Sequence, residues 1–382
     1  MDALMLPSNW QRVRLGDIAE IIGGGTPSTQ ITSFWNGSIN WFTPTEIGIT
    51  KYVYKSQRTI TPLGLKKSST KLLPIGTILL TSRASIGDCA ILKVVATTNQ
   101  GFQSLIPLEK INNEFLYYLI LTLKNKLLKL ASGSTFLEVS PNKIKNLLIP
   151  LPPLNEQIAI ANILSDLDRY LYSLDALILK KESVKKALSF ELLSQRKRLK
   201  GFNQAWQKVR LGDILSYEQP TKYLVATTQY LQKGFTPILT AGKTFILGYT
   251  NDKHGIYTNI PVIIFDDFTT DSKMVNFPFK VKSSAIKILS LRDNNQADLK
   301  YIYEKLTLLK HQVTDHKRYW IDEFSNFEIP LPPLNEQIAI ANILSALDNE
   351  IISLKNKKRQ FENIKKALNH DLMSAKIRVL RK

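Results

Sequence analysis

The sequence predicts an α+β protein in which two α/β domains alternate with two long helices that pair as an antiparallel coiled coil. Three observations predict this architecture. The stretch IPLPPLNEQIAIANILS occurs at residues 149–165 and again, without a change, at 329–345. After each copy, apolar residues follow at alternating spacings of four and three, which is the pattern of a coiled-coil seam. The regions before the two copies share little sequence but keep the same apolar frame.

Two further matches make the chain a tandem repeat. WQRVRLGDI at 10–18 returns as WQKVRLGDI at 206–214, and VKKALSFELLS at 184–194 returns as IKKALNHDLMS at 364–374. Each repeat therefore consists of a variable region followed by a constant one. The predicted domains are 1–150 (first variable domain), 151–200 (first constant helix), 201–330 (second variable domain) and 331–382 (second constant helix).

The two variable regions have a common skeleton. Residues 78–105 and 262–289 align without a gap. Both read as a buried strand, a polar loop, a second strand, a turn and a third strand, judged by their β-branched and alternating apolar residues. A short amphipathic helix is expected next, at 114–130 in the first region and at 297–311 in the second. The frame is retained while the loops differ, which indicates one scaffold with exchanged surface residues.

Each constant region predicts a helix of about 45 residues, roughly 68 Å long. Pro152 and Pro153 force an extended lead-in, because the residue before a proline is pushed out of the helical region. Asn155 is the expected N-cap, and Glu156 would lie at the positive end of the helix dipole.

Antiparallel pairing of the two helices is favoured because it makes the tandem repeat a pseudo-twofold object. The other interpretation, two independent helices that each pack on their own domain, leaves much of so long a seam uncovered. Four lysines interrupt the seam, and polar residues at such positions usually fix register. These lysines are Lys181, Lys185, Lys358 and Lys365. The expected seam contains Ile160, Leu164, Leu167, Leu171, Leu174, Ile340, Leu344, Leu347, Ile351 and Leu354.

The formal net charge of +19 indicates a polyanionic partner, most often nucleic acid. The charge is spread, with +8 in residues 1–154 and no block of five like charges, which argues against a disordered basic tail and for folded basic surfaces. A well-solvated exterior is the plainer alternative. Cys89 is the only cysteine, and with four scattered histidines it cannot make a conventional zinc site. The amino terminus lacks the order of a signal peptide, and we expect a cytoplasmic protein without a membrane partner.

Motifs for catalysis are weak. AGKT at 241–244 resembles the end of a phosphate-binding loop, but Pro237 stands where that loop needs glycine. FDDFTTDSK at 265–273 faintly suggests a metal nuclease through Asp266 and Lys273, so a DNA-modifying enzyme is the alternative function. The interval is too short for the usual strand separation. The sequence therefore predicts a binding protein without catalytic, cofactor-binding or metal-binding residues.

The LPPLNEQ motif at the start of a long helix, present twice after two dissimilar regions, resembles the specificity subunit of Type I restriction–modification enzymes. In the first half GGGTPS, FWNGSINW, SRASIG, TTNQGF and ASGSTF are similar to one class of that family's target-recognition domains. In the second half YEQPTKYLV, LTAGKTFILGYT, IIFDDFTTD and HKRYWI resemble another class.

The resemblance implies a non-catalytic, sequence-specific DNA-binding subunit. Each variable domain would read one half of a bipartite duplex target, and the helix pair would set the spacing of the two halves. Two methyltransferase (modification) subunits would dock on it, bringing S-adenosylmethionine, and restriction (motor–nuclease) subunits would bring ATP and Mg²⁺. On this interpretation the repeated stretch stays fixed because it faces two copies of one partner.

Candidate DNA contacts are polar, basic or aromatic residues on predicted loops. Arg83 has the fork that pairs with guanine, Asn99 and Gln100 have amides suited to adenine, and Asp267 would accept from a cytosine amino group. For each residue the plainer reading is a turn former or a solvated charge. A scaffold whose variable domains bind protein also stays open. The remaining candidates are Thr26, Ser28, Ser134, Thr135, Lys222, Tyr223, Lys243, Thr244, Lys317, Arg318 and Tyr319.

Overall fold

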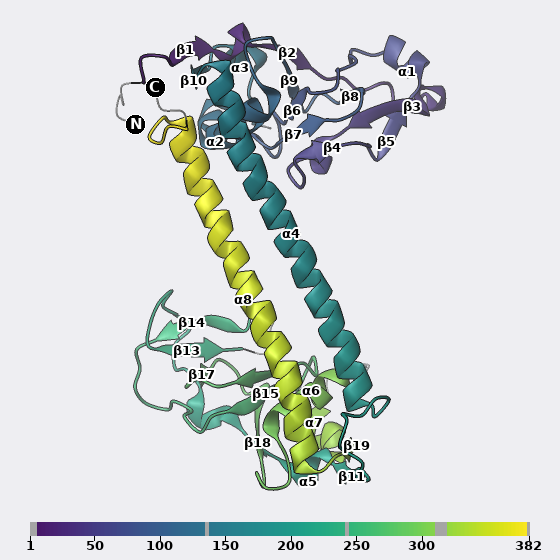
Figure 1. The fold of residues 1–382 in the computed structure, drawn as a ribbon, viewed down its shortest axis with the longest axis vertical. Helices are drawn as coiled ribbons and strands as arrows, with labels where there is room; N and C mark the ends of the chain where they lie inside the picture. Colours follow the sequence, from purple (N-terminus) through teal and green to yellow (C-terminus); the bar gives the residue numbers. More distant parts are fainter. Residues whose placement is uncertain (1–5, 134–136, 241–243, 310–318, 380–382) are drawn as a thin grey trace. The chain divides into compact units, whose positions relative to one another are not determined.

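The computed structural model describes residues 6–133, 137–240, 244–309 and 319–379. It divides into two units (Figure 1). Unit 1 contains the residues up to 175 together with those from 356 onward, and unit 2 contains residues 176–355. Each unit is described by itself. Within the described ranges, no helix is both long and apolar enough to cross a membrane.

Unit 1 contains a five-stranded sheet of order β2-β9-β6-β7-β4, a small sheet β5-β3-β8 and a ribbon β1-β10. Helix α2 packs on the main sheet through a buried face that includes Phe115 and Leu119 (Figure 1). The elements are β1 (Gln11–Arg14), β2 (Ala19–Gly23), β3 (Trp35–Phe42), β4 (Tyr52–Val53), β5 (Arg58–Ile60), α1 (Pro62–Lys66), β6 (Ile78–Leu80), β7 (Cys89–Leu92), β8 (Ala96–Thr98), β9 (Gln103–Pro107), α2 (Asn113–Leu130), α3 (Pro141–Lys145) and β10 (Leu148–Leu151).

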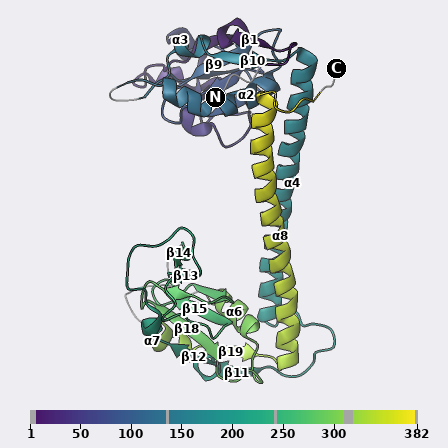
Figure 2. The same cartoon turned by 90° about the vertical axis from the view of Figure 1, so that its left-hand side faces the viewer.

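Unit 2 repeats this plan with a sheet β12-β18-β15-β16, a small sheet β14-β13-β17 and a ribbon β11-β19. Helix α6 lies between the main sheet and the long helices (Figure 2). The elements are β11 (Gln207–Arg210), α5 (Leu211–Ile214), β12 (Leu215–Glu218), β13 (Thr236–Leu239), β14 (Ile246–Thr250), β15 (Val262–Asp266), β16 (Ser272–Val275), β17 (Lys280–Val281), β18 (Ile286–Leu291), α6 (Leu299–Leu308), α7 (Tyr319–Asp322) and β19 (Glu328–Leu331).

The predicted common skeleton is confirmed. The gap-free alignment pairs β6 with β15, β7 with β16, and β9 with β18, and these strands hold the same places in the two main sheets. Where a turn was predicted between the second and third strands, each domain has a further short strand, β8 in unit 1 and β17 in unit 2. These strands belong to the small sheets, where β8 pairs in parallel with β3 and β17 pairs in parallel with β13. The two variable regions therefore fold alike although their sequences differ.

The two long helices are α4 (Leu154–Leu193) and α8 (Leu334–Met373), each of 40 residues and about 60 Å long. They pair antiparallel, because residue numbers fall along α8 as they rise along α4. In unit 1 Asp168 pairs with Lys365 and Asp175 with Lys358, the latter at 2.6 Å. In unit 2 two more bridges follow the same order. These are Lys181 with Glu350 at 2.8 Å and Lys185 with Asp348 at 2.6 Å.

All four lysines that interrupt the seam thus meet an acid on the opposite helix, which agrees with a role in fixing register. The seam itself is not uniform. Ile160 and Leu164 are fully buried, but they join the core of unit 1 together with Leu372 of α8. Leu167 and Leu171 are only half-buried. In each unit, residues of α4 and α8 therefore belong to the same apolar cluster as the variable domain.

The expected N-cap role of Asn155 was wrong, whereas Glu156 lies in the first turn of α4 as expected. Helix α4 begins at Leu154, and the Asn155 side chain accepts only from the next amide, at 2.9 Å. The carboxylate of Glu156 is 1% exposed. It accepts hydrogen bonds from the Trp10 indole at 3.1 Å and from Arg378 Nε at 2.7 Å. Glu156 therefore ties three segments of unit 1 together.

The neighbouring Gln157 is equally committed to the fold. Its amide donates to the carbonyl of Pro152 at 2.8 Å and to that of Lys110 at 3.1 Å, and its oxygen accepts from the amide of Asn112, the N-cap of α2. Glu336 and Gln337 repeat these bonds in unit 2, where Glu336 binds Trp206 and Arg198. Hydrogen bonds inside each unit thus explain why the sequence of part of the repeated stretch is kept, without reference to a partner protein.

Replacing Arg378 by methionine is expected to lower the free energy of unfolding by about 2–3 kcal/mol, because the buried carboxylate of Glu156 loses its cationic partner. Arg359→Met is the control, since Arg359 is exposed on α8 and, among the described residues, bonds only Asn356. Urea midpoints of the two variants measure the difference. Equal midpoints would contradict the role given to Glu156.

Candidate functional site

Loops 24–28 and 98–101 of unit 1 meet and bring four predicted contact residues together. The amide of Gly25 donates to the carbonyl of Thr98 at 2.9 Å, and the Thr26 hydroxyl donates to the Gln100 side chain. A β-carbon on Gly24 would lie 1.9 Å from the carbonyl oxygen of Asn99. This close approach requires glycine, and it leaves Thr26, Ser28 and Gln100 exposed.

Two tryptophans, Trp35 and Trp41, hold loop 24–28 in place through hydrogen bonds, although the sequence analysis did not select them. The Trp41 indole donates to the carbonyl of Gly25 at 2.9 Å, and the Trp35 indole donates to the carbonyl of Ser28 at 3.0 Å. Both rings are buried and pack edge to face, with centroids 5.0 Å apart. The motif FWNGSINW contained the signal, because buried tryptophans need partners for their N–H groups.

Arg83 lies beside these loops, because the amide of Ser82 donates to the carbonyl of Gly101 at 2.8 Å. Its guanidinium pairs with Glu138 at 2.9 Å and is 42% exposed. The next residue, Ala84, has a left-handed backbone with φ of 58°, so the loop has a defined turn. The predicted residues Ser134 and Thr135 lie outside the described residues.

Among the described residues of unit 2, no hydrogen bond or ion pair joins Lys222, Tyr223 or Thr244 to another predicted residue. Lys222 is exposed and lies against Gly255, in the segment that follows β14, whereas the exposed Thr244 precedes β14. Tyr223 is half-buried, donates to Glu218 at 2.8 Å and packs edge-on against Tyr257. The predicted residues Lys243, Lys317 and Arg318 lie outside the described residues.

Two predicted contacts of unit 2 are interior residues. The Asp267 carboxylate pairs with Lys287 at 3.1 Å, accepts from the amide of Trp320 at 2.9 Å and is only 5% exposed. Tyr319 is fully buried. The gap-free alignment located Asp267 next to a loop correctly but could not tell that its side chain turns inward. Neither side chain is available to a base edge in this structure.

The structure gives no support to the nuclease-like interpretation of residues 265–273. Asp266 is buried and caps its own turn, accepting from the amide of Phe268 at 2.9 Å and from the Thr269 hydroxyl at 2.6 Å. Lys273 lies over the ring of Phe245, 4.4 Å from its centre. No group of three potential metal ligands occurs among the described residues.

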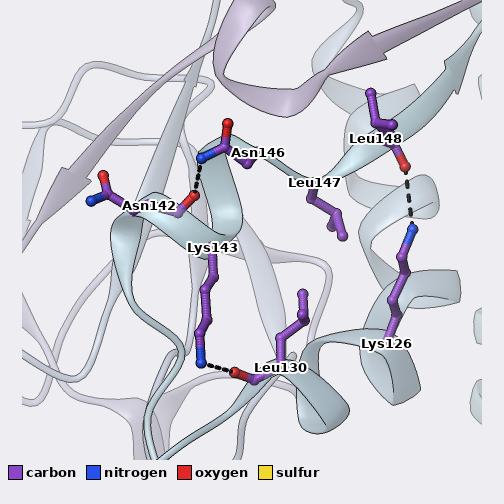
Figure 3. Close-up of a pocket in the computed structure, with 7 residues that line it drawn as sticks. All are labelled: Lys126, Leu130, Asn142, Lys143, Asn146, Leu147 and Leu148. Atoms are coloured by element: carbon purple, nitrogen blue, oxygen red, sulfur yellow. Dashed lines mark hydrogen bonds between the residues drawn. The ribbon is translucent and has the colours of Figure 1, made fainter.

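A hollow of about 480 Å³ lies elsewhere in unit 1, between α2, α3 and the start of β10 (Figure 3). The ammonium groups of its two lysines donate to backbone carbonyls of unit 1. Lys143 donates to the carbonyl of Leu130 at 2.8 Å, and Lys126 donates to that of Leu148 at 3.4 Å. Lys143 therefore satisfies a carbonyl at the carboxyl end of α2, and Lys126 links α2 to β10.

Comparison with known proteins agrees with the repeated architecture. Residues 7–181 and 203–363 each match the Type I restriction modification DNA specificity domain. The chain belongs to this family. A specificity subunit of the MjaIX enzyme from Methanocaldococcus jannaschii is 30% identical over 419 residues, with 98% of this chain and 95% of that protein covered. The EcoR124I/EcoR124II specificity subunit from Escherichia coli is 46% identical over 172 residues, which cover 44% of this chain and 41% of that relative.

Solved family structures share the fold. The S subunit of a Type I restriction–modification system from M. genitalium has a TM-score of 0.62 at 20% identity and covers 97% of this chain and 98% of its own. The HsdS subunit from Thermoanaerobacter tengcongensis has a TM-score of 0.53 at 19% identity, with 98% and 99% covered. The predicted fold class, two α/β domains with two long helices, is confirmed.

Gly24→Ala is expected to lower the free energy of unfolding by about 2 kcal/mol, because the added carbon meets the backbone of the facing loop. Gly23→Ala is the matched control, since its nearest neighbours are side-chain atoms of Gln103 at 3.7 Å. Urea denaturation measures both variants. If Gly24→Ala were as stable as Gly23→Ala, the close contact of the two loops would be refuted.

Proposed function

We propose that this chain is the DNA-specificity subunit of a Type I restriction–modification complex and supplies no catalysis itself. Each variable domain reads one half of a bipartite duplex target, and the antiparallel helix pair sets the interval between the halves. The family match over both halves and the net charge of +19 support this function. Because its partner is DNA, we infer a cytoplasmic location.

One observation carries the proposal. Two domains of the same topology offer different chemistry at corresponding places. In unit 1 the loop after β6 carries Arg83, which is partly exposed, while the corresponding position in unit 2 is the buried Asp267. Duplex sequence is read by donors and acceptors on such surfaces. Two domains with the same fold and different side chains on their loops are what reading two different half-sites requires.

The proposal also assigns the exposed part of the repeated stretch. Ile158 and Ile338 are each 42% exposed on identical sequence, and their buried neighbours Glu156 and Glu336 fix both helix starts in the same way. Identical exposed apolar residues suit two copies of one partner. We assign this surface to two methyltransferase subunits, which bring S-adenosylmethionine, while restriction subunits bring ATP and Mg²⁺.

Replacing residues 215–327 with a second copy of 19–147 is expected to give a palindromic methylated sequence in which the half-site of the first domain occurs twice. Each domain would carry its own readout, and the two halves of an antiparallel repeat would read opposite strands. Single-molecule methylation mapping of a genome that expresses the chain with its methyltransferase and restriction subunits measures the outcome. Half-site centres roughly 10 bp apart are expected from one turn of duplex. A methylated sequence that still contains the original second half-site would refute the proposal.

Ile158→Asp and Ile338→Asp are each expected to remove one of two bound methyltransferase subunits, because a carboxylate cannot be desolvated in an apolar contact. Ile352→Asp is the control, since Ile352 is 56% exposed on α8 but outside the repeated stretch. Native mass spectrometry of the complex counts the subunits. Full occupancy in both test variants would exclude this docking surface.

A further inference from the structure

Arg58, which is not among the contact residues predicted from the sequence, lies on an aromatic platform in unit 1. Its guanidinium carbon is 3.8 Å from the centre of the Trp35 ring and 5.3 Å from that of Trp41. Both rings are buried, whereas Arg58 is exposed. A guanidinium stacked on an aromatic face keeps its plane and its donors fixed while they remain accessible.

The backbone of β3 explains the stack. β5 pairs with β3 so that Arg58 lies opposite Trp41. The register shifts between Trp35 and Ile39, and Asn36 has φ of 59°, so the strand bulges and carries Trp35 back beside Trp41. A β-carbon on Gly37 would lie 2.5 Å from the α-carbon of Thr61, so this bulge requires glycine.

The guanidinium of Arg58 is available for a ligand. No carboxylate of the described part of the chain lies within salt-bridge distance of it. The nearby carboxylate of Glu46 instead accepts from the amides of Thr43 and Gln57, both at 2.7 Å. Arg83 differs in this respect, because Glu138 already neutralises it. Within the described part of the chain, Arg58 is thus a cation that two rings orient and that no carboxylate neutralises.

The same platform holds the candidate site. Trp35 and Trp41 donate to the carbonyls of Ser28 and Gly25, so the rings that orient Arg58 also support the loop that carries Thr26. Gln100 is bonded to that loop through Thr26. A planar donor fork, a hydroxyl and an amide therefore share one rigid support.

We propose that Arg58 is a specificity-determining residue that donates two hydrogen bonds to the edge of a guanine in the half-site read by the first domain. This inference rests on the proposed function. Stacking fixes the plane of the donors, and a fixed pair of parallel donors matches guanine O6 and N7. The same fork can bind two oxygens of a phosphate, but a phosphate contact carries no sequence preference, so a change in preference distinguishes the two. A lysine has no such plane.

The test compares Arg58→Ala and Arg58→Lys with Lys55→Ala, which removes an exposed charge three residues away that has no ring contact. The full complex methylates a library of duplexes that vary at each position of both half-sites. Arg58→Ala should lower the rate at the preferred target between about 5-fold and about 150-fold. Arg58→Lys should lose discrimination at one guanine position of one half-site, and Lys55→Ala should keep the wild-type preference.

Urea midpoints equal to that of the wild type show that the variants fold. Wild-type preference in Arg58→Lys would mean a phosphate contact and would overturn the inference, as would a wild-type rate in Arg58→Ala. In both cases the proposed function stands, because the wild-type complex still methylates a bipartite target. A wild-type complex without any bipartite target would instead defeat the proposed function and this inference together.

Discussion

The structure depends on one buried carboxylate in each unit. Glu156 receives hydrogen bonds from Trp10 and Arg378, and so joins the lead-in to β1, the start of α4 and the segment after α8. Because a buried carboxylate without donors is very unfavourable, separating any one of these three segments from the others would destabilise the unit strongly. Glu336 imposes the same condition on unit 2. Each domain is therefore closed by the two long helices jointly.

This closure allows the loops to vary. The bonds that fix the constant parts are made by Glu156, Gln157 and their repeats, well away from the loops around β3 and β6. The loops in turn are positioned largely through backbone groups, such as the carbonyls of Gly25 and Ser28 that accept from tryptophans. Side chains at the loop surface carry little of the fold, so they can change with the sequence that is read.

Sequence reasoning predicted the repeat, the seam lysines and the common strands, because these depend on periodic burial that one sequence displays. It did not predict that Asp267 and Tyr319 are buried, since a position next to a loop does not give the direction of a side chain. It missed Arg58 for a related reason. The stack on Trp35 exists only because β3 bulges at Asn36, and a local irregularity of this kind brings residues together without leaving a periodic pattern.

The contrast between Arg58 and Arg83 shows how a recognition surface is prepared. Both guanidinium groups lie in unit 1, but Arg83 is paired with Glu138, and a base edge would have to replace that carboxylate. Arg58 is oriented by rings, which restrict its plane without occupying its donors. Orientation that leaves the donors free lowers the entropy lost on binding and keeps the full hydrogen-bonding capacity for the ligand. On these grounds an aromatic platform is better suited to reading a base than an ion pair.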